Sequence, residues 1–254
     1  MSRVVAVANQ KGGVGKTTTA INLGAALAQR GRRILIVDLD PQANATSGLG
    51  APKSAPGSYE LLIEGTEAAE LVRETGQPGL RLIPARSDLA GAEVELVPMM
   101  AREYRLKRAI ETVKGAYDYV FVDCPPSLGL LTINALAAAN EVLVPVQCEY
   151  LALEGLSHLM NTVDLVRRHL NGGLRVSGLL LTMFDARTNL AQQVVDEVRA
   201  HFPQTFLTVI PRNVRVSEAP SHGLPLCAYD PRSAAARAYD ALAAEVLQQE
   251  EVAA

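Results

Sequence analysis

The sequence lacks the features of a disulfide-rich, secreted or membrane-spanning protein. It has three cysteines, Cys124, Cys148 and Cys227, and no C-x-x-C pair, which disfavours a disulfide framework and a thiolate metal site. No stretch approaches the run of about 20 apolar residues that crosses a bilayer. The start, MSRVVAVANQ, is interrupted too soon by polar residues to be a signal peptide. These absences favour a cytoplasmic protein whose cysteines are small buried residues.

Low-complexity tracts and a strong charge imbalance are also absent. Of 254 residues, 48% are hydrophobic and 20% are charged, which is typical of a folded globular chain. The formal net charge is −3, so any nucleic-acid contact would need a local basic patch. The length favours a single α/β domain over residues 1–254.

Short apolar runs alternate with helix-length segments along the chain. Apolar runs of this kind, buried on both faces, predict an α/β fold with a mostly parallel central sheet flanked by helices on both faces. The first helix is expected over 18–29, where Gly31 ends it. We expect strands within 3–8, 33–38, 117–123, 141–146, 174–182 and 206–210, and further helices over 59–73, 99–114 and 234–249.

A glycine-rich segment separates the first strand from the first helix. It closes with Gly15-Lys16-Thr17, the ending of the phosphate-binding pattern G-x-x-x-x-G-K-[ST], although Gln10 stands where the first glycine belongs. Backbone N–H groups of such a turn face phosphate oxygens, Lys16 would reach the β- and γ-phosphates, and Thr17 would ligate Mg²⁺. The segment therefore predicts nucleotide binding rather than a plain turn, and Lys11 adds a second lysine to it.

Three aspartates follow apolar strands, at the edge where a parallel sheet binds its ligands. Asp123 ends YVFVD and is the expected acid of the metal shell, but CPPS follows it where fast ATPases often have a glutamate. Asp38 and Asp40 end the second strand, and Asp40, further into the loop, could meet a water in line with the γ-phosphate. Either could instead cap the turn before Pro41. A carboxylate is a weak base, so we expect slow turnover.

Five motifs together resemble the ParA/Soj chromosome-partition ATPases of the deviant Walker A class, a P-loop NTPase family. The resemblance runs from Val4 to about Tyr239. The first motif alone would fit the wider class that includes MinD and iron-protein-like ATPases. The motifs are KGGVGKTT (11–18), VDLDPQANAT (37–46), YDYVFVDCPPSLG (117–129), PVQCEYLALEGL (145–156) and IPRNVRVSEAPSHG (210–223).

The resemblance implies a role for individual residues. Lys11 matches the signature lysine that reaches across a dimer to the partner's ATP, Lys16 the P-loop lysine and Thr17 the magnesium ligand. Asp40 matches the catalytic aspartate of the first switch, which also belongs to the metal shell, and Asp123 the acid of the second switch. The remaining expected nucleotide contacts are Gly12, Gly13, Val14, Gly15, Thr18, Glu149 from across the dimer, and Pro211 and Asn213 at the adenine.

Family members bind non-specific DNA as ATP-dependent homodimers, and a ParB/Spo0J-type centromere-binding protein stimulates their hydrolysis. The resemblance thus implies a cytoplasmic, nucleoid-associated protein. Arg187 and Arg215 match two DNA-contacting residues, and the stretch between them holds four arginines against two acids. Binding of this kind falls steeply with salt. The stretch REYRLKR at 102–108 is a second basic candidate, for which a solvated helix face is the alternative.

Two other classes of protein share the first motif. A MinD-like ATPase would need a basic amphipathic C-terminal anchor, but residues 240–254 contain no Lys or Arg and four acids. An iron-protein-like reductase or a biosynthetic ATPase would be a second alternative. The cluster of such a reductase would need paired cysteines, whereas Cys124 directly follows Asp123 beside the nucleotide.

Overall fold

A single sheet organises the molecule. The computed structural model describes residues 2–149 and 152–253, so two residues of the motif at 145–156 lie outside the described residues. The strand order is β3-β4-β2-β5-β1-β6-β7-β8, and every pair is parallel except β3 with β4. This confirms the expected α/β fold. The strands are β1 (Arg3–Val7), β2 (Ile34–Asp38), β3 (Arg73–Glu74), β4 (Leu80–Ile83), β5 (Tyr119–Asp123), β6 (Glu141–Gln147), β7 (Arg175–Phe184) and β8 (Thr205–Pro211).

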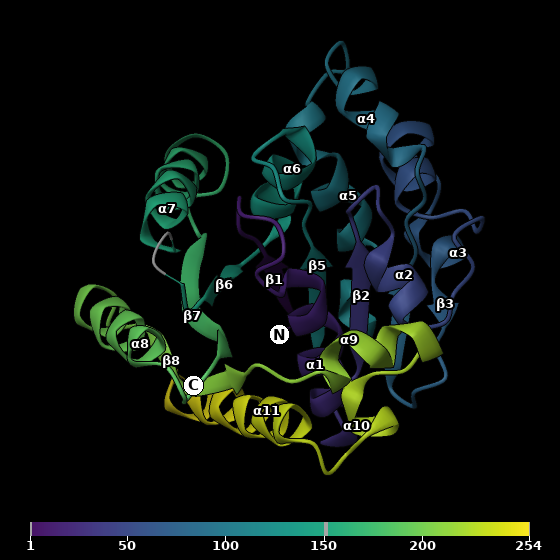
Figure 1. Cartoon of the computed structure of the whole chain (residues 1–254). Helices are drawn as coiled ribbons and strands as arrows, with labels where there is room; N and C mark the ends of the chain where they lie inside the picture. The colour runs from purple at the N-terminus through teal and green to yellow at the C-terminus, as the bar shows by residue number, and fades with distance from the viewer. Residues whose placement is uncertain (1, 150–151, 254) are drawn as a thin grey trace.

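Helices cover both faces of this sheet (Figure 1). In β1, Val4 and Ala6 belong to one hydrophobic core and Val5 and Val7 to the other, because successive side chains of a strand point to opposite faces. The first core includes residues of α5, α6, α7 and α8, and the second includes residues of α1 and α11. The helices are α1 (Lys16–Gln29), α2 (Asn44–Gly48), α3 (Ala68–Leu71), α4 (Leu89–Glu95), α5 (Arg105–Glu111), α6 (Leu130–Ala138), α7 (Ala152–His169), α8 (Asn189–His201), α9 (Arg215–Glu218), α10 (Leu226–Tyr229) and α11 (Ala234–Ala253).

The prediction of one continuous helix over 59–73 is wrong, because three separate elements occupy this range. A π-helical turn covers Glu60–Glu64, and Gly65 then adopts a left-handed φ of 76°, which ends it. The short helix α3 and strand β3 follow, and β3 pairs with β4. Apolar spacing over 59–73 suits one long helix, so only the turn at Gly65 could have signalled the break.

The helix expected over 99–114 is likewise shorter. Ala101 takes a left-handed φ of 51°, a short 3₁₀ turn covers Arg102–Tyr104, and α5 spans seven residues. By contrast, the helices expected over 18–29 and 234–249 are confirmed by α1 and α11, with Gly31 left-handed after α1. Figure 1 shows α11 packed alongside α1 below the sheet.

Candidate functional site

The carboxyl ends of the central strands meet at one edge of the sheet. In the strand register Asp123 of β5 lies opposite Val7 of β1 on one side and opposite Asp38 of β2 on the other. The glycine-rich loop follows β1 directly, so it reaches the same edge. Gly13 and Gly15 have φ of 74° and 93°, conformations that favour glycine, and α1 begins at the next residue, Lys16.

The loop is held by side chains that the sequence analysis did not single out. The Asn9 carboxamide accepts a hydrogen bond from the Lys11 backbone N–H at 3.0 Å and donates to the Pro145 carbonyl of β6 at 2.7 Å. The Thr182 hydroxyl donates to the Val14 carbonyl at 2.8 Å. Hydrogen bonds to β6 and to β7, which are neighbours in the sheet, therefore hold the loop in place. Asn9 stands just before the glycines, so its place in the motif was the available signal.

Lys16 points back over the loop that it terminates. Its ammonium group donates to the Lys11 carbonyl at 3.0 Å, and the residue is only 7% exposed. Burial lowers the pKa of Lys16, and the negative charges of Asp123 and Asp40 oppose that shift. The ammonium group thus lies near the carboxylates of this edge and is held by the loop's own backbone.

Asp123 is a fully buried carboxyl group that makes no hydrogen bond of good geometry within the part of the chain that the structure describes, although the Thr17 hydroxyl lies close to it. Neither of its side-chain oxygens has a partner among the described residues, although both are inaccessible. Burial, followed by the charge of Asp38, raises the pKa of Asp123 well above its ordinary value, while Thr17 and Lys16 act in the opposite direction. Buried polar groups are nearly always satisfied, so an unpartnered carboxyl beside a threonine hydroxyl fits the oxygen ligands that Mg²⁺ takes.

Asp38 and Asp40 have different roles in the same loop. Asp38 is fully buried and accepts hydrogen bonds from the Thr46 hydroxyl and from the backbone N–H groups of Asp40 and Thr46. Burial raises the pKa of Asp38 to about 6 against the lowering effect of these bonds. The structure therefore shows Asp38 as a loop-holding residue, one of the two alternatives left open.

Asp40 lies in the cleft as expected, and it also caps a turn. Its Oδ1 accepts from the Gln42 N–H at 2.9 Å, and the residue is 7% exposed. Asp40 therefore both caps the turn and lines the cleft. From that position it is available to a bound phosphate group or water.

A cleft of about 470 Å³ opens beside Lys16, Thr17 and Asp40, whereas the fully buried Asp38 and Asp123 do not line it. That volume suits a small-molecule site. A smaller cavity of about 150 Å³ adjoins it, because both are lined by Gly15, Thr18 and Met183. Pro211 and Asn213, the expected adenine contacts, line the smaller one. The main cleft is lined, among others, by Gly12, Gly13, Gly15, Lys16, Thr17, Thr18, Asp40, Gln42, Pro126 and Ser217.

Lys11 lies at the exposed rim and pairs within its own chain. Its ammonium group is 3.6 Å from the Glu149 carboxylate, which also faces Arg212 at 3.7 Å. The structure thus brings together two residues expected at a dimer contact. Exposed pairs of this kind contribute about 0–1 kcal/mol, so the contact leaves Lys11 able to exchange partners.

Each arginine expected at DNA has an acidic neighbour. Arg187 is highly exposed and pairs with Asp185 at 2.6 Å, and Arg215 pairs with Glu218 at 2.7 Å and with Asp230 at 3.3 Å. Residues 187–215 contain two acids, but these three carboxylates lie outside that stretch and pair with its arginines. The surface is therefore less basic than the count indicated.

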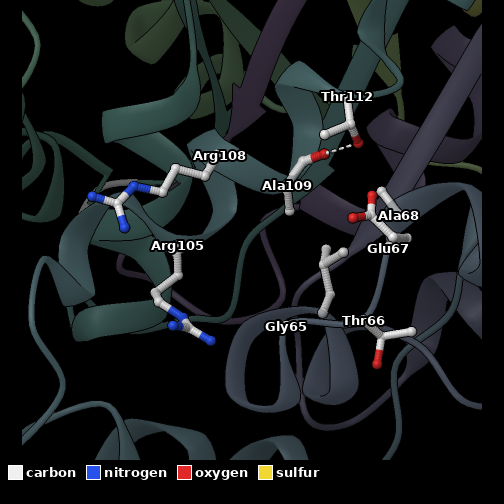
Figure 2. A pocket seen from close by; sticks show the side chains of 9 residues that line it. Gly65, Thr66, Glu67, Ala68, Arg105, Arg108, Ala109 and Thr112 are labelled. Carbon is white, nitrogen blue, oxygen red and sulfur yellow. Dashed lines mark hydrogen bonds between the residues drawn. The ribbon is translucent and has the colours of Figure 1, made fainter.

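The second basic candidate, at 102–108, is partly used inside the fold. Arg105 donates to the carbonyls of Leu62 and Ile63 at the end of the π-helical turn, and Arg102 pairs with Glu103. Figure 2 shows Arg105 directed at the Gly65 segment, and Arg108 turned away from it, in a cavity of about 220 Å³. The solvated helix face given as the alternative therefore does not describe Arg105, which is held by backbone carbonyls, whereas Arg108 is exposed.

Comparison with known proteins decides the family. A family model described as an AAA domain matches residues 2–176. The chain is 58% identical to the sporulation initiation inhibitor protein Soj of Bacillus subtilis (strain 168) over 97% of this chain and 98% of that protein. It is 53% identical to the chromosome partitioning protein ParA of Myxococcus xanthus (strain DK1622) over 98% and 89%. The chain belongs to the ParA/Soj family of chromosome-partitioning ATPases.

A solved structure shares the whole ParA/Soj fold seen here. It is described as cobyrinic acid a,c-diamide synthase from Mycobacterium smegmatis with a bound ATP analog and magnesium. It matches with a TM-score of 0.88 and 40% identity over 100% of this chain and 98% of that one. Among the described residues of this ParA/Soj family member, no helix is long and apolar enough to span a bilayer.

We predict that Asp123→Asn stabilises the nucleotide-free protein at neutral pH. A carboxyl group whose pKa is raised by folding binds its proton more tightly in the native state, so stability falls as pH rises above the unfolded value of about 4. The variant removes this loss. Thermal unfolding at pH 7.5 should give a Tm at least about 2 °C higher than wild type, and the gap should narrow toward pH 4.5.

Asp118→Asn is the matched control. Arg33 lowers the pKa of Asp118 to about 2. The ionised Asp118 carboxylate therefore stabilises the folded protein, and this stabilisation is lost as pH falls. A pH-independent destabilisation by Asp123→Asn would contradict the assignment of a strained, unpaired carboxyl group.

Proposed function

We propose that this chain is a single-domain ATPase that hydrolyses ATP to ADP and phosphate and acts as a DNA-partition switch. The observation that carries the proposal is the buried, unpartnered carboxyl group of Asp123 at the end of β5. It lies behind the cleft, next to Thr17 and Lys16, which line it. A cleft with this chemistry supports a nucleoside triphosphate with its metal ion.

The proposed chemistry divides the work among few residues. Backbone N–H groups of the loop and Lys16 bind the phosphates, and Thr17, Asp40 and Asp123 would hold Mg²⁺, which neutralises phosphate charge. Asp40 orients the attacking water. Hydrolysis is slow because a carboxylate is a weak base and no glutamate follows Asp123. Pro211 and Asn213 bind the adenine at the smaller cavity.

The proposed switch is a nucleotide-dependent homodimer. Lys11 leaves Glu149 of its own chain for the partner's ATP, while the partner's nucleotide approaches Glu149. A ligand that favours one of two states shifts the population toward it, and here that ligand is ATP. The dimer binds DNA without sequence preference through Arg187 and Arg215, in the nucleoid of the cytoplasm, and a ParB-type partner stimulates hydrolysis and release.

Two alternatives are weaker. The solved relative with 40% identity is described as a biosynthetic enzyme, which keeps that class open, whereas the relatives with 58% and 53% identity are named for sporulation inhibition and chromosome partitioning. A MinD-like membrane role has less support, because the relatives with 58% and 53% identity are not named for it. Joint stimulation of ATPase activity by DNA and a ParB-type protein would favour partition over both.

The two loop lysines make a matched pair of variants. We expect Lys16→Ala to lose ATP binding by at least about 100-fold, since a buried charge contact to phosphate is removed. Lys11→Ala should bind ATP within about threefold of wild type but remain monomeric. Nucleotide titration and light scattering with ATP distinguish the two. Normal ATP affinity in Lys16→Ala would refute the phosphate site, and normal dimers in Lys11→Ala would refute the role in assembly.

For DNA binding we expect Arg215→Glu to lose non-specific duplex binding while it keeps ATP-dependent dimerisation. The reason is that phosphate contacts supply most non-specific affinity. Binding at two salt concentrations should show both weaker affinity and a shallower salt dependence. Arg167→Glu on α7 is the control, since Arg167 also pairs with an acid three residues away, at 2.7 Å. Equal losses in both variants would argue against a defined DNA surface.

A further inference from the structure

The loop that carries Asp40 is held at both ends by one buried carboxylate. Asp38 Oδ1 accepts from the Asp40 backbone N–H at 3.2 Å, where the loop leaves β2. Asp38 Oδ2 accepts from the Thr46 backbone N–H at 2.8 Å and from the Thr46 hydroxyl at 2.7 Å, within α2. Both Asp38 and Thr46 are 0% exposed. The Asp38 side chain therefore connects the two ends of segment 40–46.

Thr46 also joins this segment to the chain just beyond β4. Its hydroxyl oxygen accepts from the Ala85 N–H at 2.8 Å, two residues beyond the end of β4. The Ser58 hydroxyl donates to the Asp38 backbone carbonyl. A threonine hydroxyl has one donor and two acceptor positions, so donating to Asp38 and accepting from Ala85 fixes its rotation. The contact cannot be copied by an apolar side chain of the same shape.

The loop between these anchors holds a strained turn. Ala43 is not a glycine, yet its φ is 54°, and it is 1% exposed. Its N–H donates to the Asp40 carbonyl at 2.8 Å. Residues held in such conformations are strained and persist only where their surroundings determine them. Thr46 lies three residues after Ala43, and its hydroxyl anchors the end of the same loop to Asp38 and Ala85.

We infer that Thr46 is a positioning residue for ATP hydrolysis: its hydroxyl locks the Asp38 carboxylate and thereby fixes the backbone from which Asp40 enters the cleft. Asp38 is then the link between Thr46 and Asp40, and neither Thr46 nor Asp38 touches the nucleotide. The inference rests on the proposed ATPase function and deepens it. Loss of the hydroxyl should loosen the Asp40 loop and slow the chemical step without weakening ATP binding.

The test compares Thr46→Val with Thr46→Ser. Valine keeps the shape but leaves the Ala85 N–H without its acceptor and removes one of the two hydrogen bonds to Asp38 Oδ2, whereas serine keeps the hydroxyl. We expect kcat to fall about 10- to 100-fold in Thr46→Val, as for a misplaced catalytic group, with the Kd for ATP within about threefold of wild type. Thr46→Ser should keep kcat within about threefold.

Hydrogen exchange gives a readout that needs no ATPase activity. In nucleotide-free Thr46→Val, amides of segment 40–46 should exchange at least about tenfold faster than in wild type, with the central strands unchanged. Thr75→Val is the matched control. The Thr75 hydroxyl likewise has two partners: it donates to the carbonyl of Leu80, the first residue of β4, at 2.8 Å and accepts from the Gln77 backbone N–H at 3.2 Å. It should leave segment 40–46 and kcat unchanged.

Three results would overturn the inference. Thr46→Val could exchange and turn over like wild type, Thr46→Ser could fail together with Thr46→Val, or Thr46→Val could lose ATP binding. An inactive wild-type protein would instead refute the proposed ATPase function, and the exchange rates of segment 40–46 would still show whether Thr46 fixes the loop.

Discussion

The parallel pairing of β5 with β1 and β2 is the constraint on which the site depends. It places Asp123 opposite Asp38 and Val7 at a single level of the sheet, so the first loop, the second loop and the β5 carboxylate reach one edge together. The apolar strands, buried on both faces, hold this register, since a one-residue slip would turn their side chains to the wrong core. The chemistry of the edge therefore follows from the packing of the sheet.

The charged groups buried at this edge, Lys16, Asp38 and Asp123, are not all paired or hydrogen-bonded. Asp38 is satisfied by three hydrogen bonds, and Lys16 is directed at the Lys11 carbonyl among the acids. Asp123 has no partner among the described residues, and burial raises its pKa. An unpaired buried carboxyl group is costly in the free protein, and a bound cation with phosphate would remove that cost. Ligand binding and local stability are coupled for this reason.

Much of this arrangement could be predicted from sequence, because it rests on local patterns. Apolar runs identified six of the eight strands, and the glycine-rich ending with Lys16 identified the loop. Strand β4, only four residues long, could not be predicted, since its signal is too short. The bridging role of Asp38 depends on Thr46, eight residues away, and the pairing of Arg187 with Asp185 depends on side-chain rotamers. The first contact is set by tertiary packing and the second by local side-chain conformation, neither of which apolar or glycine patterns encode.

The most direct test of the account is the proton count on binding of preformed Mg·ATP at pH 7. Calorimetric titrations in two buffers of different ionisation enthalpy give the number of protons that the protein releases. Since metal ligands bind deprotonated, wild type should release protons that Asp123→Asn does not. Equal proton release by the two proteins would contradict the claim that the buried Asp123 carboxyl group, at the end of β5, loses its proton to bind the metal.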